Sequence, residues 1–327
     1  MQKLLILATT LLFAPFALAI DTQRPNVAQF IDTMVQQHDF RRGDLRSLLR
    51  NAQSKRAIIE MMMHPPEQVY PWFEYRDRLL TARRIDKGLS FCKQQSDALQ
   101  RAEQTTGVSA DTIVGILGVE TMFGEITGNY RVLDSLATLA FDYPPRAEFF
   151  AGELEQFLLL TREEKIDARK VLGSYAGAIG APQFMPSSYR KLAVDGDRNG
   201  RRDLWNSWPD IVTSVGNYLK SNGWRTGEPV VVSATLDSAD LPKFDTSKIR
   251  LNETVASLRE KGARFEIDLP PDTPAMLIVV EGRDGNEYRV GFHNFIAITR
   301  YNPRIKYALA VHDLGAAIAR ARDDAAR

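Results

Sequence analysis

The sequence predicts a mainly α-helical, α+β protein with a small β-rich region near its C-terminal end. Amphipathic runs, punctuated by proline and glycine, fill residues 24–224 and return from residue 294. Between them, residues 227–291 contain β-branched and alternating segments, which are typical of strands. With 327 residues, the chain is long enough for two or three such units.

Composition places the chain among ordinary globular proteins. Hydrophobic residues make up 44% and charged residues 25% of the sequence. Forty-two basic residues stand against 41 acidic residues, which gives a net charge near +1. Because nucleic-acid affinity depends on a basic surface, this balance argues against a dedicated nucleic-acid-binding protein.

Residues 1–19 are predicted to be a signal peptide. A short basic start is followed by an apolar segment over residues 4–18, and Ala17-Leu18-Ala19 fits the small-x-small cleavage pattern. The apolar segment is too short, and interrupted by Pro15, for a typical membrane span. We therefore expect export to the periplasm and cleavage after Ala19. An uncleaved N-terminal anchor is the alternative.

Cysteine usage limits the covalent chemistry. Cys92 is the only cysteine, so an intrachain disulfide is impossible. No cysteine stands directly after the predicted cleavage site, so we expect no N-terminal lipid on the mature chain. We expect a soluble mature protein without a membrane anchor, in which Cys92 is a packing residue rather than a nucleophile.

The first helical region covers residues 24–104. It contains amphipathic runs over residues 27–35 and 44–49 and is interrupted by prolines at positions 65, 66 and 71. The aromatic and charged segment 72–78 follows these breaks. Such a segment suits the wall of a sugar site, but it also suits an ordinary half-buried helix face.

The second helical region covers residues 109–224. Its first helix is expected to begin at the N-cap Ser109 and to end at Gly124, with later helices near residues 149–160 and 211–222. Strands are then expected over residues 230–236, 275–281 and 287–292, with a hairpin turn at 283–286. The last helix, over residues 308–326, is expected to pack back on the helical part.

Glu120 breaks the hydrophobic pattern of the helix that contains it. Ile113, Leu117 and Glu120 fall on one stripe, so a carboxylate stands where an aliphatic residue is expected. It is either a structural carboxylate paired with an arginine, or a desolvated general acid whose pKa is raised towards neutrality. Gly115 and Gly118 favour the second interpretation, because glycine inside a helix is costly unless something must approach closely.

A second unusual segment, residues 173–189, combines glycines and prolines with polar groups. Ser174 and Gln183 offer hydrogen bonds, and Phe184 and Met185 offer apolar contact to a sugar ring. A tight crossing between a helix and a loop would explain the glycines but not the polar cluster.

A third segment, residues 195–203, fits the opening of a calcium-binding loop. Oxygen donors stand at positions 1, 3 and 5, glycine at position 6 and a backbone carbonyl at position 7, from Asp195, Asp197, Asn199, Gly200 and Arg201. Position 12 holds Asn206 instead of glutamate, and Asp210 could close a longer loop. The alternative is a solvated turn.

A fourth segment places Tyr301 and Asn302 before the last helix, where they suit either a polar ligand or a simple Asn-Pro helix start.

The sequence gives little support for other classes of catalytic site. The four histidines are scattered without metal-ligand spacing, and neither a Gly-x-Ser-x-Gly elbow nor a Walker-type phosphate loop occurs.

Taken together, these segments resemble the lytic murein transglycosylase B family, in a soluble form without a lipid anchor. The resemblance runs from about residue 75 to 310 and rests on ordered motifs at residues 118–124, 174–180, 183–189, 195–205 and 299–302 with 307–308. It implies a lysozyme-like catalytic core with an extra helical domain and a small β-rich domain. The implied boundaries are 1–19 for the signal peptide, 20–75 plus 308–327 for the helical domain, 76–226 plus 292–307 for the core with its calcium loop, and 227–291 for the β-rich domain.

The resemblance also implies roles for individual residues. Glu120 would be the sole acid/base. The side chains that position the muramic acid sugar would be Ser174, Gln183, Tyr301 and Asn302, and those that line the cleft would be Tyr75, Phe184, Met185 and Tyr307. A calcium ion, with a structural role, would be held by Asp195, Asp197, Asn199, the carbonyl of Arg201 and, last, Asp210. One departure is Arg304, where the family often has a small hydroxyl residue.

The implied activity is cleavage of the β-1,4 bond between N-acetylmuramic acid and N-acetylglucosamine, with formation of 1,6-anhydromuramoyl ends. A muramidase-type hydrolase of the same bond would need a second carboxylate, for which Glu125, Asp134 and Asp142 are nearest in sequence. A non-catalytic peptidoglycan-binding protein is the third hypothesis. The expected partners are peptidoglycan glycan strands and other cell-wall enzymes, not nucleic acid, and the protein is expected to be a monomer without an organic cofactor.

Overall fold

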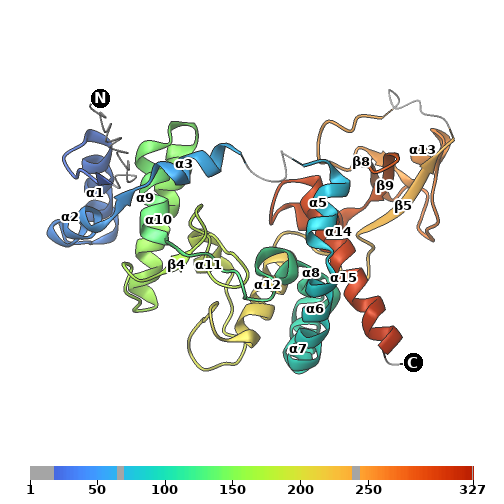
Figure 1. Cartoon of the computed structure of the whole chain (residues 1–327), viewed down its shortest axis with the longest axis horizontal. Helices are drawn as coiled ribbons and strands as arrows, with labels where there is room; N and C mark the ends of the chain where they lie inside the picture. Colours follow the sequence, from blue (N-terminus) through green and yellow to red (C-terminus); the bar gives the residue numbers. More distant parts are fainter. Residues whose placement is uncertain (1–17, 65–69, 238–243, 326) are drawn as a thin grey trace, which may run out of the picture.

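The computed structural model describes residues 18–64, 70–237, 244–325 and 327. Helices dominate and one five-stranded sheet lies near the C-terminal end, so the predicted fold class is confirmed (Figure 1). Residues 1–17, the body of the predicted signal peptide, lie outside the described residues. No helix in the described ranges has both the length and the apolar character of a membrane span.

One half of the molecule is built from N-terminal and central helices. Strands β1 (Leu18–Ala19) and β2 (Gln53–Ser54) pair there. Its helices are α1 (Pro25–His38), α2 (Arg42–Asn51), α3 (Arg56–Met63), α9 (Val132–Asp142), the 3-10 helix η1 (Pro144–Arg146) and α10 (Ala147–Glu163). Phe30 of α1 meets Phe141 of α9 edge-on, with ring centroids 5.8 Å apart. This contact joins α1 to the C-terminal end of α9.

The other half contains the helix with Glu120. Its helices are α5 (Trp72–Leu79), α6 (Ala82–Gln94), α7 (Ser96–Thr106), α8 (Ala110–Thr121), α12 (Trp208–Ser221), α14 (His293–Thr299) and α15 (Ile305–Ala325). Helix α15 packs along α8 and also contacts α5 and α6. Figure 1 shows α1, α2 and α3 at the opposite side of the molecule from α15. The contacts thus group the helices differently from the expected domain of residues 20–75 plus 308–327.

Close packing of α8 on α15 depends on two glycines. A Cβ atom added at Gly115 would lie 2.2 Å from the carbonyl oxygen of Val311, and one added at Gly315 would lie 2.3 Å from that of Asp111. Both distances are far below van der Waals contact. The element that packs closely on Gly115 is therefore the C-terminal helix α15.

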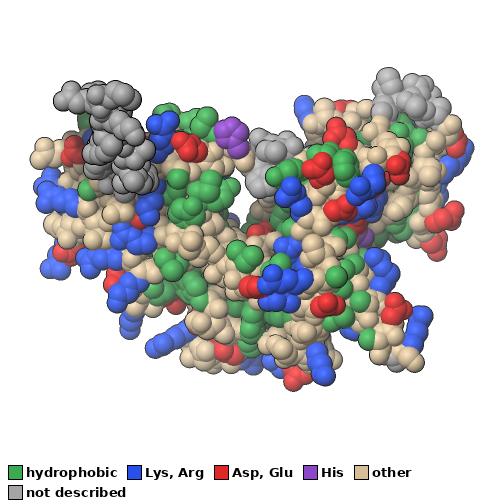
Figure 2. Space-filling view, in the orientation of Figure 1, with side chains coloured by type: hydrophobic (Ala, Val, Ile, Leu, Met, Phe, Trp, Pro, Cys, Tyr) green, Lys and Arg blue, Asp and Glu red, His purple; other side chains and the backbone are tan. Residues whose placement is uncertain are grey.

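The segment between α10 and α12 links the two halves. It contains β4 (Leu172–Gly173), which pairs with β3 (Tyr130–Arg131), and the short helix α11 (Pro186–Leu192). In the space-filling view, the outline of the molecule is hollowed between the two halves (Figure 2). Basic and acidic side chains are interspersed on this face, as the balanced composition predicts.

The β-rich region forms one antiparallel sheet with the strand order β6-β8-β9-β5-β7. Its elements are β5 (Val231–Leu236), β6 (Glu253–Thr254), α13 (Val255–Glu260), β7 (Ala263–Arg264), β8 (Pro274–Gly282) and β9 (Gly285–Gly291). Gly282 pairs with Gly285, so Arg283 and Asp284 form a two-residue hairpin loop. The predicted strands and hairpin are confirmed, whereas β6, β7 and α13 were not predicted.

The sheet is fixed to the helices by polar contacts. Trp72 Nε1 donates to Glu287 Oε2 at 3.1 Å, which joins α5 to β9. Arg289 of β9 contacts both carboxylate oxygens of Asp313 in α15 at 3.2 Å. These side chains are partly buried, so the contacts hold the sheet against α5 and α15.

Candidate active site

Glu120 lies in the last turn of α8 and is half-buried. Ser109 caps the other end of this helix by accepting a hydrogen bond from the Thr112 amide, as predicted. The C-terminal prediction is wrong, because α8 ends at Thr121 rather than Gly124. The next three residues, from Met122 to Gly124, all have left-handed backbone conformations, with φ of 51°, 60° and 81°. This tight turn begins two residues after Glu120, directly after the last residue of α8.

Tertiary packing holds the turn in this conformation, which is uncommon for residues other than glycine. The Phe123 ring stacks on Phe91 of α6 at 5.1 Å between centroids. The hydroxyl of Thr121, which is buried, donates to the Ala181 carbonyl at 2.8 Å and accepts from the Gly124 amide at 2.9 Å. Thr121 therefore connects the end of the Glu120 helix to the glycine-rich segment 173–185.

A tyrosine from the C-terminal helix contacts Glu120 directly. The Tyr307 hydroxyl donates to Glu120 Oε1 at 2.6 Å. Tyr307 is buried, and desolvation together with the charge of Glu120 raises its pKa well above the ordinary range. The phenol therefore stays protonated and acts as a hydrogen-bond donor.

Further aromatic side chains extend from Tyr307. The Tyr301 ring lies nearly parallel to the Tyr307 ring, with centroids 6.4 Å apart, and its hydroxyl donates to the Pro182 carbonyl at 2.5 Å. Tyr218 of α12 packs at 4.6 Å from the Tyr301 ring and 5.5 Å from Phe184. Burial and the charge of Glu120 raise the pKa of Tyr301, so it too remains a neutral phenol.

The polar side chains of the glycine-rich segment shape its backbone. Ser174 Oγ accepts hydrogen bonds from the Ala176 and Ala178 amides at 3.3 and 3.0 Å. Gln183 has φ of 51°, and its Nε2 donates to the carbonyls of Thr127 and Gly180 at 3.1 and 2.8 Å. Both amide hydrogens of Gln183 are therefore used within the protein.

A pocket of about 420 Å³ opens beside these residues. Of the predicted sugar-binding side chains, Gln183, Phe184, Met185 and Tyr301 line it. A larger pocket, of about 620 Å³, lies beside the predicted calcium loop and is lined by none of the predicted sugar-binding residues. We assign the smaller pocket to the site, because its Tyr301 wall adjoins the Tyr307 side chain that binds Glu120.

Each carboxylate that was considered as a second catalytic group has cationic partners elsewhere. Glu125 pairs with Lys87 and Arg83, whose hydrogen bonds and charges hold its pKa below the usual range despite partial desolvation. Asp134 is fully buried and pairs with Lys55 at 3.1 Å, while Asp142 pairs with Arg24 at 2.7 Å. These contacts explain all three carboxylates as structural groups.

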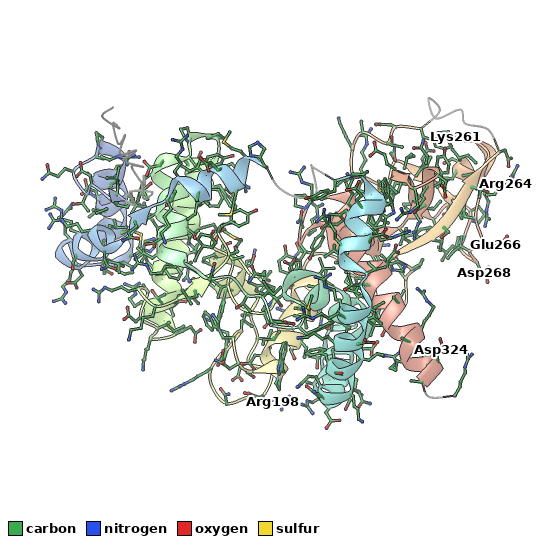
Figure 3. All side chains as sticks on the ribbon, viewed as in Figure 1. Arg198, Lys261, Arg264, Glu266, Asp268 and Asp324 are labelled. Carbon is green, nitrogen blue, oxygen red and sulfur yellow. The ribbon has the colours of Figure 1, made fainter. Side chains whose placement is uncertain are left out.

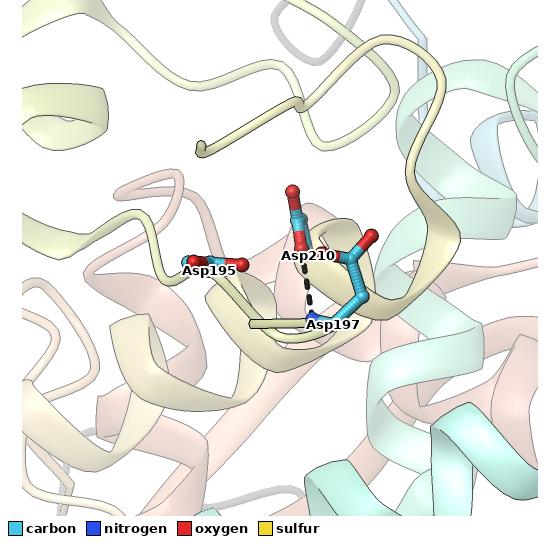
Figure 4. Close-up of side chains that lie close together, drawn as sticks. All are labelled: Asp195, Asp197 and Asp210. Carbon is cyan, nitrogen blue, oxygen red and sulfur yellow. Dashed lines mark hydrogen bonds between the residues drawn. The ribbon is translucent and has the colours of Figure 1, made fainter. Parts of the chain in front are cut away.

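The three acidic residues of the predicted calcium site lie together. Oxygen atoms of Asp195, Asp197 and Asp210 lie within 4.8 Å of one another (Figure 4). Asp210 belongs to α12, is fully buried and accepts backbone hydrogen bonds from Gly196 and Asp203, each at 2.8 Å. No salt bridge reaches the three carboxylates from any described residue, so their chemistry fits a divalent cation.

The other loop residues have defined contacts. The Asn199 side-chain oxygen accepts from the Arg201 amide at 3.0 Å, and Asn206 donates to the Asp203 carboxylate at 3.0 Å. The Asn206 side chain therefore binds Asp203 rather than joining the cluster of Asp195, Asp197 and Asp210. Arg198 lies at the outer surface, at the tip of the loop, where its charge is exposed to solvent (Figure 3).

Comparison with known proteins identifies the family. Residues 22–316 match the family model described as the transglycosylase SLT domain. The membrane-bound lytic murein transglycosylase B of Escherichia coli (strain K12) is 41% identical over 307 residues, which cover 91% of this chain and 84% of that protein. The chain belongs to the lytic murein transglycosylase B family. It is an enzyme, a lytic transglycosylase of peptidoglycan.

Two solved structures extend the comparison. The E. coli lytic transglycosylase Slt35 in complex with calcium is 40% identical, with a TM-score of 0.84 over 94% of this chain and 96% of that chain. SltB3 from Pseudomonas aeruginosa, in complex with NAG-anhNAM-pentapeptide, is 30% identical, with a TM-score of 0.77 over 89% and 79% of the two chains. The lysozyme-like fold expected for a lytic murein transglycosylase B is thus confirmed.

The other predicted sugar-site residues of this lytic transglycosylase, Tyr75, Ser174, Asn302 and Tyr307, are not among the residues that line the pocket. Tyr75 is buried in α5, Ser174 supports the turn at residues 176–178, and Asn302 is half-buried beside Tyr301. Other lining residues were not predicted, among them Tyr218 and Glu153. Glu153 comes from α10 and accepts hydrogen bonds from the Ser187 amide and hydroxyl at 3.0 and 2.6 Å. Neither residue has a local sequence signal, because each reaches the pocket only through helix packing.

Proposed function

We propose that Glu120 is the single acid/base of this lytic transglycosylase. The observation that carries the proposal is the hydrogen bond from Tyr307 to Glu120 Oε1, next to a pocket lined by Tyr301 and Gln183. A hydroxyl donor on Oε1 orients the carboxyl group that exchanges a proton with substrate. Glu120 would then work as an acid and a base in successive steps.

The proposed reaction cleaves the β-1,4 bond between N-acetylmuramic acid and N-acetylglucosamine. Glu120 donates its proton to the glycosidic oxygen as the bond from that oxygen to C1 breaks. The 2-acetamido group of the muramic sugar stabilises the positive charge at C1. The Glu120 carboxylate then takes the proton of the C6 hydroxyl as the C6 oxygen bonds to C1. The products are a free N-acetylglucosamine 4-hydroxyl and a 1,6-anhydromuramoyl end, and no water is consumed.

The pocket supports a sugar ring beside Glu120. The Tyr301 ring is held in place by the hydrogen bond from its hydroxyl to the Pro182 carbonyl. Phe184 and Met185 add apolar surface. Because its amide hydrogens are held by Thr127 and Gly180, Gln183 has its Oε1 as the remaining polar group for a sugar hydroxyl. We include Ser174, Asn302 and Tyr75 as supports of this surface.

Calcium binding is part of the same proposal. The three clustered carboxylates would hold the ion together with the Asn199 side chain and the Arg201 carbonyl. A bound cation would neutralise this acidic cluster and brace the loop between α11 and α12. Its role would be structural rather than catalytic.

We also propose export to the periplasm, with cleavage after Ala19. Cleavage would remove β1, but the new N-terminal residue, Ile20, would stay packed against the folded protein. Ile20 is buried, and its backbone nitrogen donates to the Ala52 carbonyl at 3.1 Å. N-terminal sequencing of the protein from a periplasmic extract tests this point, because a chain that starts at Met1 would exclude cleavage.

Glu120→Gln tests the assignment of the acid/base. The amide has the same shape but cannot supply the proton, so we expect cleavage of purified sacculi to fall by at least a thousandfold, at an unchanged melting temperature. Glu125→Gln is the matched control, because Glu125 lies near in sequence but pairs with Arg83 and Lys87. Full activity in the Glu120 variant would contradict the assignment.

A further inference from the structure

A second groove adjoins the proposed sugar pocket. Its volume is about 440 Å³, and it lies between the end of β8 at residues 279–281, Asn286 of β9 and residues 303–306 before and at the start of α15. Pro303 lines both the groove and the sugar pocket. A ligand in the pocket can therefore extend over Pro303 towards the small β-rich domain.

The groove carries two cations and one carboxylate. Arg304 and Lys306 stand on one wall, and Glu281 stands on the other side, which leaves a net positive charge. Arg304 is exposed and forms no salt bridge with any residue that the structure describes. Lys306 differs, because its Nζ already donates to the Tyr70 carbonyl at 2.6 Å. Arg304 is therefore the cation that is available to bind a ligand in the groove.

The backbone holds Arg304 at this position. Its amide donates to the Asn302 carbonyl at 2.7 Å, and its own carbonyl accepts from the Ala308 amide at 3.2 Å in the first turn of α15. A short turn around Pro303 thus links Arg304 to Asn302 and Tyr301.

The lining suits a peptide better than a sugar ring. No aromatic side chain is among the described residues that line the groove, whereas aromatic rings dominate the neighbouring pocket. Aliphatic surface from Ile249, Val279 and Ile305 forms its apolar part. A guanidinium group binds a carboxylate through two parallel hydrogen bonds. These features together fit a short chain with small apolar side chains and a free carboxylate.

We propose that this groove binds the peptide stem attached to the muramic acid sugar, and that Arg304 binds a carboxylate of that stem. The inference rests on the proposed position of the sugar beside Glu120. Arg304 acts as a specificity-determining residue, which favours strands whose stems are intact. It takes no part in the transfer of protons.

The test compares one pair of substrates on two variants. Arg304→Gln removes the charge, and Arg304→Lys keeps the charge but not the bidentate geometry. The substrates are defined N-acetylglucosamine–N-acetylmuramic acid oligosaccharides with and without pentapeptide stems. For Arg304→Gln we expect kcat/KM to fall about five- to tenfold on the stem-bearing substrate, through KM, and to stay unchanged on the bare one. Arg304→Lys should lie between wild type and Arg304→Gln.

A matched control removes an arginine elsewhere on the same domain. Arg264 lies at the far edge of the β-rich domain (Figure 3), and Arg264→Gln should leave both substrates unaffected. The loss in Arg304→Gln should also shrink as salt is raised, since exposed charge pairs are screened. Equal losses on both substrates, or no loss on either, would overturn the proposal. A wild-type enzyme that fails to cleave either substrate would instead contradict the proposed function.

Discussion

The Tyr307 hydroxyl donates a 2.6 Å hydrogen bond to Glu120 Oε1, which joins the first turn of α15 to the last turn of α8. Two residues that lie 187 positions apart in sequence therefore bring their helices together at one carboxyl group. The geometry of this carboxyl depends on the packing of α15 as much as on its own helix.

We first predict that Tyr307→Phe lowers kcat by roughly 10- to 100-fold, because a hydrogen bond to an ionisable group contributes about 1.5–3 kcal/mol. KM should change little, since the ring that faces Tyr301 remains. Steady-state kinetics on soluble glycan strands provides the measurement. Tyr288→Phe, in the sheet, removes a hydroxyl remote from Glu120 and should be silent. An unchanged kcat for Tyr307→Phe would show that the hydroxyl does not support catalysis.

The second prediction concerns helix contact. Gly115→Ala should destabilise the protein by about 2 kcal/mol or more, because the new methyl group would lie 2.2 Å from the Val311 carbonyl and push α15 away. Activity should fall with it, since Tyr307 moves with α15. Gly152→Ala is the control, as nothing lies within 4 Å of a Cβ at Gly152. That variant should be neutral or up to about 1 kcal/mol more stable in urea denaturation.

A third prediction separates transglycosylase from hydrolase. Glu153 is the carboxylate among the described residues that line the pocket, and its two oxygens accept hydrogen bonds from the Ser187 amide and hydroxyl. Glu153→Gln should cost about 1–2 kcal/mol of stability through the weakened contact with α11, while kcat stays within a few fold of wild type. If the variant folds but loses activity as completely as Glu120→Gln, Glu153 is a second catalytic carboxylate.

The fourth prediction concerns calcium. Added calcium should raise the melting temperature of the wild-type protein by several degrees, because an ion that binds only the folded state stabilises it by mass action. Asp195→Ala should abolish this shift, because it removes one of the three clustered carboxylates. Asp324→Ala, near the exposed end of α15 (Figure 3), should retain the full shift. An equal shift in all three proteins would place the ion elsewhere.

Local sequence signals predicted the features that depend on neighbouring residues. The Ser109 cap and the Arg283-Asp284 hairpin are confirmed, because a cap and a two-residue turn are determined within a few positions. The left-handed pair Met122 and Phe123 had no such signal. Stacking on Phe91, from α6, supports this conformation, and a single sequence does not state which aromatic residues will meet.

The same reason explains what was missed at the site. Tyr218 and Glu153 reach the pocket from α12 and α10, and neither stands in a distinctive motif. Gly115 did carry a signal, because an interior glycine requires a close neighbour, but the neighbour is α15 rather than a ligand. Gly315 in the last helix was the complementary signal. The two glycines together could have predicted that α8 packs on α15.

The most direct test of the account is the fate of water in the reaction. Purified sacculi digested in water enriched in oxygen-18 can be analysed by mass spectrometry of the released muropeptides. A single acid/base at Glu120 predicts 1,6-anhydromuramoyl products that are one water lighter than reducing products and carry no heavy oxygen. Reducing ends that contain oxygen-18 would contradict the account, because they require hydrolysis at C1.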